Sequence, residues 1–358
     1  MTWLKTTIGD VLPFKYGRGL PERERSGSGQ FRVVGSGGVA GSHSFALTSG
    51  PSVVIGRKGS IGAVYYFAEP VWPIDTTFYV QGSASVDARF AYYLLGQLPL
   101  DKMNSDSAVP GLNRAHAESI EIELPPIVQQ REIAATLGAL DDKIDSNQDF
   151  AASTLELIRA GVEGSITADS EKIPVSGLAE FVNGGAYTKG ATGAGRMVIR
   201  IAELNSGPGD STVYTDLEVP DNRMARPGDI LMAWSGSLGV HRWSRDEAII
   251  NQHIFKVLPY DYPEWLVYDR IQTAMPTFRA IARDKATTMG HIQRRHLIET
   301  VISLPSRTAT DELDRVFGPL WQRLLVAERE SITLAKLRDA LIPELLSGRT
   351  RTPSGLDE

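Results

Sequence analysis

The feature that most constrains the fold is a long internal repeat, in which the second half of the chain restates the first about 180 residues later. The segment LNRAHAESIEIELP, Leu112–Pro125, matches IQRRHLIETVISLP, Ile292–Pro305, without a gap. Shorter pairs keep the same order: GSIG with GSLG, PIDTTFYV with IINQHIFKV, and TLELIR with TLAKLR. Two units that share a fold but differ in their loops are expected to do similar jobs with different specificities.

Each half starts with short β-branched runs bounded by glycine, which indicate strands, and continues into a helical pattern. The expected fold class is therefore α+β, with two similar domains that are each followed by a long helix. The expected strands are Phe31–Val34, Val53–Ile55, Ala63–Phe67, Thr77–Val80, Val198–Ile201, Ile230–Ala233 and Ile254–Leu258, and the expected shorter helices are Ala88–Leu98 and Trp265–Arg283.

The long helices are predicted by apolar residues that recur with 4-3-4-3 spacing, as in the seam of a coiled coil. Pro125 and Pro126 set a sharp start for the first helix. Its seam comprises Ile133, Leu137, Leu140, Ile144, Ala151, Leu155, Ile158 and Val162, with a polar step at Asn147. The second seam comprises Leu313, Phe317, Leu320, Leu324, Ala327, Ser331, Leu334, Leu337 and Leu341.

A helix of about 40 residues is about 60 Å long, and alone it would leave its apolar stripe without a partner. Two such stripes can bury each other, and an antiparallel pair with pseudo-two-fold symmetry is expected. In the alternative, each helix packs only on its own domain. The expected domains are residues 1–126 and 171–305, the expected helical regions are 127–168 and 306–348, and residues 349–358 are expected to form a disordered tail.

Composition and charge limit the classes of protein to which the chain can belong. The chain of 358 residues contains no cysteine, which excludes disulfides and thiolate metal sites. No apolar run reaches the roughly 18 residues of a membrane span, and the start lacks a secretory signal, so a cytoplasmic location without membrane association is expected. The net charge is −6, but residues 1–126 carry 11 basic and 11 acidic residues, and residues 171–305 carry 15 of each. A local basic face on each domain is therefore compatible with the acidic total.

Motifs of catalysis are absent from the sequence. It contains no HExxH, no GxxxxGK[ST] and no GxSxG. His291 and His296 are five residues apart, the wrong spacing for one helical face, and Asp141, Asp142 and Asp145 are expected on a solvated helix face. An active site within this chain is therefore disfavoured.

The chemistry that the sequence does offer is binding. Strand ends with Gly, Ser, Arg and Lys bring backbone amides and cations close to phosphates, and Arg and Lys also read guanine edges. The alternative is that these are ordinary surface cations and turn residues. The candidates in the first half are Lys15, Arg18, Arg32, Arg57, Lys58 and Ser60, and those in the second half are Lys189, Arg200, Trp234, Ser235 and Ser237.

These motifs in their doubled order resemble the specificity (S) subunit of type I restriction–modification systems over residues 3–349. The resemblance rests on WLKTTIGDVLPFKYG, GRKGSIG and GSLG, PIDTTFYV and INQHIFKV, LPPIVQQREIAATLGALDDKID and LRDALIPELLSGR. The chain departs from the family at Val128–Gln130, where a start like LxEQ is common, and in SRTATDEL, which lacks that start altogether. Trp234-Ser235 before GSLG, in place of Arg-Lys, fits two domains that read different bases.

The resemblance implies a non-catalytic subunit with two target recognition domains, each of which reads one half of a split, asymmetric double-stranded DNA site. The helices would form an antiparallel coiled coil that sets the spacing of the half-sites. Two modification subunits that methylate adenine, and restriction subunits with translocase and nuclease activity, would be the protein partners. The chain itself would hold no cofactor, because S-adenosylmethionine, ATP and Mg²⁺ would belong to those partners. The competing hypotheses are a two-headed protein-interaction scaffold without DNA specificity and an enzyme whose site forms between the halves.

Overall fold

A computed structural model describes residues 3–25, 27–103, 110–284 and 290–351. The chain divides into two compact units. The first unit comprises residues 1–143 and 334–358, and the second comprises residues 144–333. The expected tail lies outside the described residues from position 352 on. None of the helices in the described part of the chain combines the length and the apolarity that a membrane span requires.

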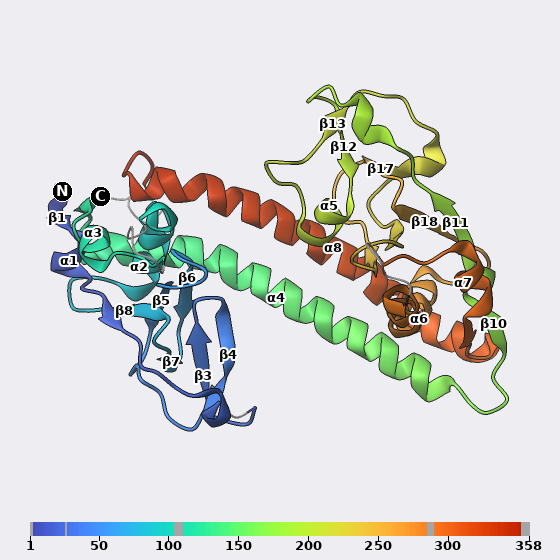
Figure 1. Ribbon diagram of the computed structural model, residues 1–358, viewed down its shortest axis with the longest axis horizontal. Coiled ribbons are helices and arrows are strands. Elements are labelled where there is room, and N and C mark those ends of the chain that lie inside the picture. Colours follow the sequence, from blue (N-terminus) through green and yellow to red (C-terminus); the bar gives the residue numbers. More distant parts are fainter. Residues whose placement is uncertain (1–2, 26, 104–109, 285–289, 352–358) are drawn as a thin grey trace. The chain divides into compact units, whose positions relative to one another are not determined.

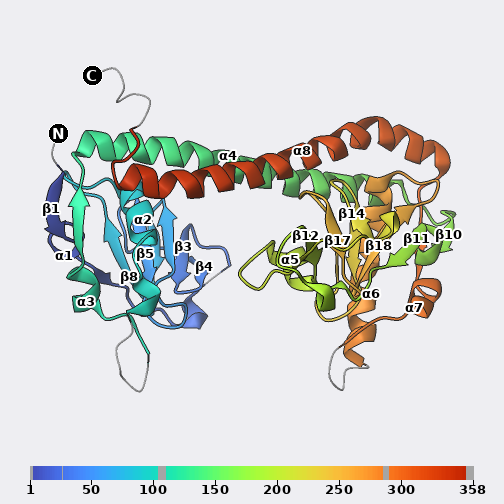
Figure 2. The ribbon, with the colours of Figure 1, turned by 90° about the horizontal axis from the view of Figure 1, so that it is seen from above.

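The first unit is built on three small sheets (Figures 1 and 2). One four-stranded sheet has the order β2-β8-β5-β6, a three-stranded sheet has the order β4-β3-β7, and β1 pairs with β9. The elements are β1 (Leu4–Thr7), α1 (Ile8–Val11), β2 (Lys15–Tyr16), β3 (Phe31–Gly35), β4 (Gly38–His43), β5 (Ser52–Gly56), β6 (Val64–Phe67), β7 (Val71–Pro73), β8 (Thr77–Gln81), α2 (Ala88–Gly96), α3 (Arg114–Glu118), β9 (Glu121–Leu124) and the first part of α4 (Ile127–Ser165).

The second unit repeats this plan with longer helices. Its sheets have the orders β11-β18-β15-β16 and β13-β12-β17-β14, and β10 pairs with β19. The elements are β10 (Lys172–Pro174), β11 (Ala179–Asn183), β12 (Arg196–Ile199), α5 (Ile201–Ser206), β13 (Tyr214–Thr215), β14 (Met224–Ala225), β15 (Ile230–Ala233), β16 (Gly239–Arg242), β17 (Ala248–Ile250), β18 (Ile254–Pro259), α6 (Glu264–Asp284), α7 (Arg294–Glu299), β19 (Val301–Ser303) and the first part of α8 (Arg307–Leu346).

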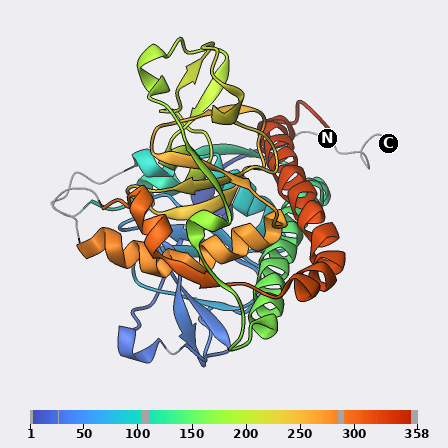
Figure 3. The same ribbon diagram turned by 90° about the vertical axis from the view of Figure 1, so that its right-hand side faces the viewer.

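The sequence repeat is a repeat of topology. In both units the first strand pairs antiparallel with the last: Leu4 faces Leu124 in one unit, and Lys172 faces Ser303 in the other. In both, a parallel pair joins the second sheet, β3 with β7 and β12 with β17. The units differ where β4 of the first is replaced by α5 and β13 in the second. Strands β12 and β13 lie at the side of their unit away from α4 (Figures 1 and 3).

The α+β class expected from the sequence is confirmed, with one local correction. The strand expected at Val198–Ile201 ends at Ile199, because Ile201 starts helix α5. Arg200 caps that helix, and its backbone N–H donates to the Glu203 carboxylate at 3.0 Å. The apolar residue was thus assigned to the wrong element, since a short apolar run does not distinguish the end of a strand from the first turn of a helix.

Segments of α4 and α8 pack antiparallel within each unit. In the second unit, Asn147 Nδ2 donates to the Ala327 carbonyl at 3.3 Å and to the Glu330 carboxylate at 2.8 Å. Further along, Gly161 faces the Phe317 ring so closely that a Cβ would lie 2.6 Å from it. In the first unit, Arg338 donates to Asp141 at 2.7 Å. The alternative in which each helix packs only on its own domain is therefore wrong.

The expected seam residues occupy the inner side of both helices, with one exception. Ile133, Leu137, Ile144, Ile158, Phe317 and Leu324 are buried, and Leu140, Leu155, Leu313, Leu320, Leu334 and Leu341 are partly buried. Leu337 is 47% exposed, so its assignment to the seam is wrong. Leu337 follows Leu334 by three residues where the 4-3 alternation requires four, so the inward position is Arg338, and the buried residues of the last turns are Ile342 and Leu345.

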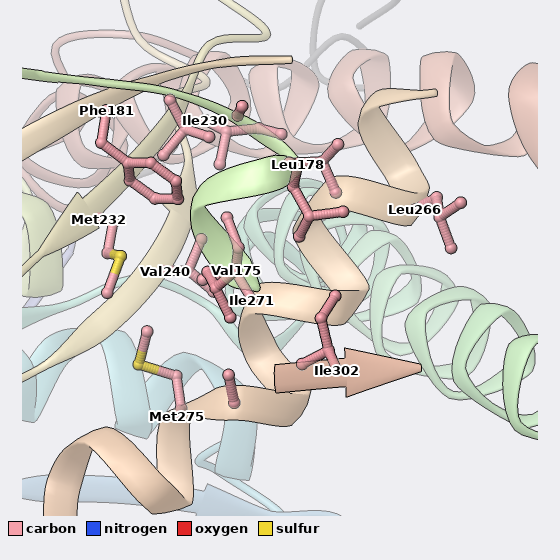
Figure 4. Packing of buried hydrophobic residues seen from close by; sticks show 14 of the residues in the cluster. Val175, Leu178, Phe181, Ile230, Met232, Val240, Leu266, Ile271, Met275 and Ile302 are labelled. Atoms are coloured by element: carbon pink, nitrogen blue, oxygen red, sulfur yellow. The ribbon is translucent and has the colours of Figure 1, made fainter. Parts of the chain in front are cut away.

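Each unit has its own apolar core. In the second unit, strands β11, β15 and β16 pack on α6 through Phe181, Met232 and Met275, with Ile302 of β19 at one side (Figure 4). In the first unit, β5, β8 and α2 surround a cluster that also takes in Leu137 of α4 and Leu345 of α8. The long helices are therefore part of both cores.

Two leucine truncations in these helices are expected to differ sharply in cost. Leu137→Ala empties a site with 0% exposure, which should lower the free energy of unfolding by about 2–5 kcal/mol. Leu337→Ala, at a half-exposed site, should change it by about 0.5 kcal/mol or less. Urea unfolding followed by circular dichroism measures both. Equal losses would contradict the corrected seam.

Candidate nucleic-acid interface

In the first unit, the ends of three strands meet at one margin of the four-stranded sheet. The Arg57 N–H donates to the Thr76 carbonyl at 2.9 Å, and the Gly17 N–H donates to the Thr77 carbonyl at 3.0 Å. The end of β5, the start of β8 and the end of β2 are thus fixed side by side. We call residues 15–18, 57–60 and 75–76, together with Arg114, the first edge.

Arg57 is the central cation of the first edge. Its guanidinium lies 5.3 Å from the centroid of the Tyr16 ring and 5.8 Å from that of Phe78. Arg114 approaches the same Tyr16 ring at 5.7 Å. The Nε of Arg57 is buried and has no hydrogen-bond partner among the described residues. Because buried polar groups are normally paired, this unpaired donor distinguishes Arg57 from the other cations of the first edge.

The other candidates of the first half are less concentrated. Lys15 lies 6.0 Å from the Tyr79 ring centroid and Arg18 lies 6.0 Å from that of Trp72. Lys58 and Ser60 are exposed in the turn after β5. Arg32 is exposed on β3, which belongs to the other sheet, so it is not part of the first edge.

The turn that carries Lys58 and Ser60 depends on glycine. The Gly56 N–H donates to the Ala63 carbonyl and the Gly62 N–H donates to the Gly56 carbonyl, which closes the loop tightly. Gly62 has φ 75°, and a Cβ there would lie 2.4 Å from the Asp101 nitrogen. A side chain at this position would therefore open the turn. The GSIG motif is thereby explained as a backbone requirement.

The second unit builds a matching margin with other side chains. The Trp234 N–H donates to the His253 carbonyl at 3.2 Å, and the Trp234 carbonyl accepts from Ile292 at 2.9 Å. Arg57 makes the corresponding bonds, to Thr76 and from Leu112. Trp234 therefore stands at the position of Arg57. We call residues 183–185, 234–237 and 251–253, together with Arg294, the second edge.

The second edge is aromatic and mostly neutral. The Trp234 indole N–H donates to the Asn183 side chain at 2.9 Å. The Trp234 ring lies 5.8 Å from that of Phe255 and 5.4 Å from that of His253. Arg294 lies over the Phe255 ring at 5.6 Å. In Figure 2, α3 and α7, the helices of Arg114 and Arg294, each lie on the side of their own unit away from α4 and α8.

The remaining candidates of the second half are scattered. Ser235 is buried and forms a β-bridge with His291, whereas Ser237 is exposed in the turn. Lys189 is exposed in the short helix Tyr187–Gly190. The structure thus brings Trp234 and Ser235 together and places Lys189 in a separate loop.

Arg200 is engaged in the protein itself. It forms an ion pair at 2.5 Å with Glu203, which is only 2% exposed, and it donates to the Ser211 carbonyl at 2.6 Å. Burial alone would raise the pKa of Glu203, but the hydrogen bonds from Arg200 outweigh it and hold that pKa below its ordinary value. The pair therefore stabilises the fold above the ordinary pKa, and this contribution is lost as the pH falls through the lowered one.

Sequence reasoning missed several residues of the edges. They are Tyr16, Arg114, Asn183, Gln252, His253 and Arg294. The gapless match of the Leu112 and Ile292 segments places Arg114 and Arg294 at one position, which is the signal that could have found this pair. In the described part of the chain, no group of three or more acidic or histidine side chains could hold a metal ion. The edges offer donors, acceptors and ring faces, which is the chemistry of binding.

Comparison with known families gives one match. Residues 1–153 match the family model described as the type I restriction modification DNA specificity domain. No curated protein matches the chain significantly. The resemblance to specificity subunits seen in the sequence is confirmed by this match.

Three solved structures resemble the chain over nearly its full length. The S subunit of a type I restriction–modification system from M. genitalium has 14% identity and a TM-score of 0.64, with 96% of each chain covered. The HsdS subunit from Thermoanaerobacter tengcongensis has 15% identity and a TM-score of 0.32, with 98% of this chain and 97% of that one covered. A structure concerned with complex assembly and conformational transition of the type I system has 14% identity and a TM-score of 0.33, covering 96% and 97%. The first of these shows a shared fold.

Two arginines are expected to behave differently when truncated. Arg200→Ala leaves the Glu203 charge buried without its partner and should cost about 2–3 kcal/mol of stability, below the roughly 3–5 kcal/mol of a fully buried pair. Arg57→Ala loses only ring contacts and should cost about 1 kcal/mol or less. Urea unfolding at neutral pH and at pH 4 measures both effects. The cost of Arg200→Ala should shrink in acid, and a constant cost would contradict the assigned ion pair.

Proposed function

We propose that the chain is the DNA-recognition subunit of a type I restriction–modification complex, from the premise that residues 1–153 match the family model of the type I restriction modification DNA specificity domain. In this proposal each edge reads one half of a bipartite, asymmetric site in double-stranded DNA. The chain positions adenine-modification and restriction subunits on that DNA and performs no chemistry itself.

The observation that carries the proposal is the pair of edges with one backbone and two sets of side chains. Arg57 and Trp234 make corresponding backbone hydrogen bonds, yet one is a cation and the other an aromatic hydrogen-bond donor. A guanidinium suits acceptor groups such as guanine O6 and N7 or phosphate oxygens. Recognition of two unlike half-sites requires two backbones of similar geometry that carry different side chains.

The net charge of the chain is consistent with DNA phosphate contacts that are divided between this chain and its partner subunits. Non-specific affinity comes from cations that neutralise phosphates, and a protein with net charge −6 supplies few in excess. We assign much of the phosphate contact to the modification subunits, which would complete the interface around the duplex. S-adenosylmethionine, ATP and Mg²⁺ would be bound by the partner subunits.

The helices would act as a spacer between the half-sites. Two recognition elements on one face of a duplex must lie near a whole number of helical turns apart. Continuous helices of 39 and 40 residues can hold such a distance, because their hydrogen bonds are internal and their seams are packed. The outer faces of the same helices are available for the modification subunits.

The two rival functions make different predictions. A protein-interaction scaffold would leave no sequence-dependent footprint on DNA. An enzyme with a site between the halves would show activity in the isolated chain. A DNA footprint and an activity assay on the isolated chain therefore separate both rivals from the proposed function.

Exchange of one domain tests the proposal directly. Replacement of residues 1–126 by the corresponding domain of a relative should change only one half of the methylated motif in a host that also expresses the modification subunits. Sequencing of methylated adenines reads the motif. An unchanged motif, or a change in both halves, would refute the assignment of one half-site to each domain.

Lengthening both helices tests the spacer. Three heptads inserted after Lys143 and three after Thr333 keep both seams in step and add about 31.5 Å, which is close to one helical turn of DNA. The expected motif has its half-sites unchanged and a spacer longer by about one helical turn. The matched control, the same insertion in α4 alone, should misalign the seam and prevent modification. An unchanged spacer in the double insertion would show that the helices do not set it.

A further inference from the structure

We infer that Gln252 is the base-reading side chain of the second edge and that it recognises an adenine in the major groove. This inference rests on the proposed function, because it concerns how the second domain reads its half-site. It concerns a residue of the IINQHIFKV motif that was not among the candidate binding residues.

Gln252 occupies the corner where the two sheets of the second unit meet. It lies between Ile250, the last residue of β17, and Ile254, the first residue of β18. The Asn251 N–H donates to the Ile199 carbonyl of β12 at 3.1 Å, and the Ile254 N–H donates back to Asn251 at 3.1 Å. The turn is therefore anchored to both sheets, while the Gln252 side chain is exposed. A rigid anchor with an exposed amide is the arrangement that recognition needs.

A chain of contacts holds the Gln252 amide in place. Its Nε2 lies 3.3 Å from His253 Nε2, and the His253 ring packs at 5.4 Å on Trp234. Trp234 is fixed in turn by its hydrogen bond to Asn183. Because an amide nitrogen donates, His253 Nε2 must accept, and the ring proton then sits on Nδ1. The Gln252 oxygen and the second N–H of its amide make no hydrogen bond to another described residue, which leaves one acceptor and one donor.

Unsatisfied polar atoms concentrate at this turn. Five buried side-chain nitrogen or oxygen atoms of the described residues lack a hydrogen-bond partner, and two of them are Asn251 Oδ1 and His253 Nδ1. A third is Arg57 Nε at the first edge. Folded proteins rarely leave such atoms unpaired, and unpaired ones call for a missing partner. Their location flanks Gln252, which points to a ligand at this corner.

The hydrogen-bonding groups of the Gln252 amide determine which base it can recognise. An amide offers one donor and one acceptor side by side, and adenine presents the complementary N7 acceptor and N6 donor in the major groove. At the first edge the equivalent positions are Asp75 and Thr76, next to Arg57, so that edge is charged where the second is neutral. The two domains would thus read different bases from the same corner of the fold.

Three variants of the full chain, each expressed with the modification subunits, test the inference by mapping methylated adenines in the host DNA. Gln252→Ala should lose discrimination at a single adenine position of one half-site, by roughly 5- to 150-fold in relative modification rate. Gln252→Glu should shift preference at that position toward cytosine, whose N4 amino group donates to a carboxylate. His253→Ala, which frees the amide, should weaken discrimination at the same position.

Gln322→Ala, an exposed glutamine on α8, is the matched control and should leave every base of the motif unchanged. A motif that is identical in wild type, Gln252→Ala and Gln252→Glu would overturn the inference and leave the proposed function standing. A wild-type complex that methylates no split motif would overturn both. Co-purification of each variant with the modification subunits shows that the chain has folded.

Discussion

The pairing of the first strand of each unit with its last is the interaction on which the rest of the architecture depends. Thr7 of β1 faces Glu121 of β9, and Pro174 of β10 faces Val301 of β19. Each sheet pair brings the entry and the exit of a domain together, and the exit strand runs through proline directly into α4 or α8. The long helices therefore start from a fixed point on the domain, and the strand ends that carry the edges are built between two anchored termini.

A second set of contacts ties the helix that follows each sheet to α4. In the first unit, Arg89 of α2 forms an ion pair at 2.6 Å with Asp142, whose pKa it lowers. In the second, Arg270 of α6 pairs with Glu163 at 2.9 Å and with its neighbour Asp269 at 2.6 Å. Burial raises the pKa of Asp269, and Arg270 offsets this only in part. Arg270 is buried although the Glu163 side chain is half-exposed, so another helix position would leave this cation without its partners, which favours a single packing arrangement.

The elements and the repeat could be predicted from sequence because they depend on local patterns. The strand at Val53–Ile55 and the helix at Trp265–Arg283 follow from periodicity and flanking glycines, and both are found. The seam failed at Leu337, where the position of Arg338 opposite Asp141 decides which face of α8 is inward. An apolar pattern does not mark this arginine, because its ion pair with α4 forms only in the tertiary structure.

The edges could be predicted only in part, for a similar reason. Arg57 and Trp234 stand beside glycine motifs, so the sequence marks them. Gln252 and His253 lie in a stretch that looks like the start of a strand, and their proximity to Trp234 arises from hydrogen bonds between β15 and the turn before β18. Arg200 shows the converse, because a basic residue near a strand end proved to be the partner of a buried Glu203. Spacing in the sequence identifies candidate cations, whereas the residues with which they form ion pairs are determined by the tertiary structure.

Because the end of α8 belongs to the core of the first unit, the first domain cannot complete its core early in synthesis. Ile342 and Leu345 belong to the same apolar cluster as Ile133 and Leu137, although about 200 residues separate them in the sequence. The ribosome must therefore make almost the whole chain before the first domain can cover this part of its core. Until then the stripe on α4 stays exposed to chaperones and to nascent copies of the same protein. A chain truncated before α8 would carry that exposure permanently, so premature termination should yield aggregates instead of a free, folded first domain.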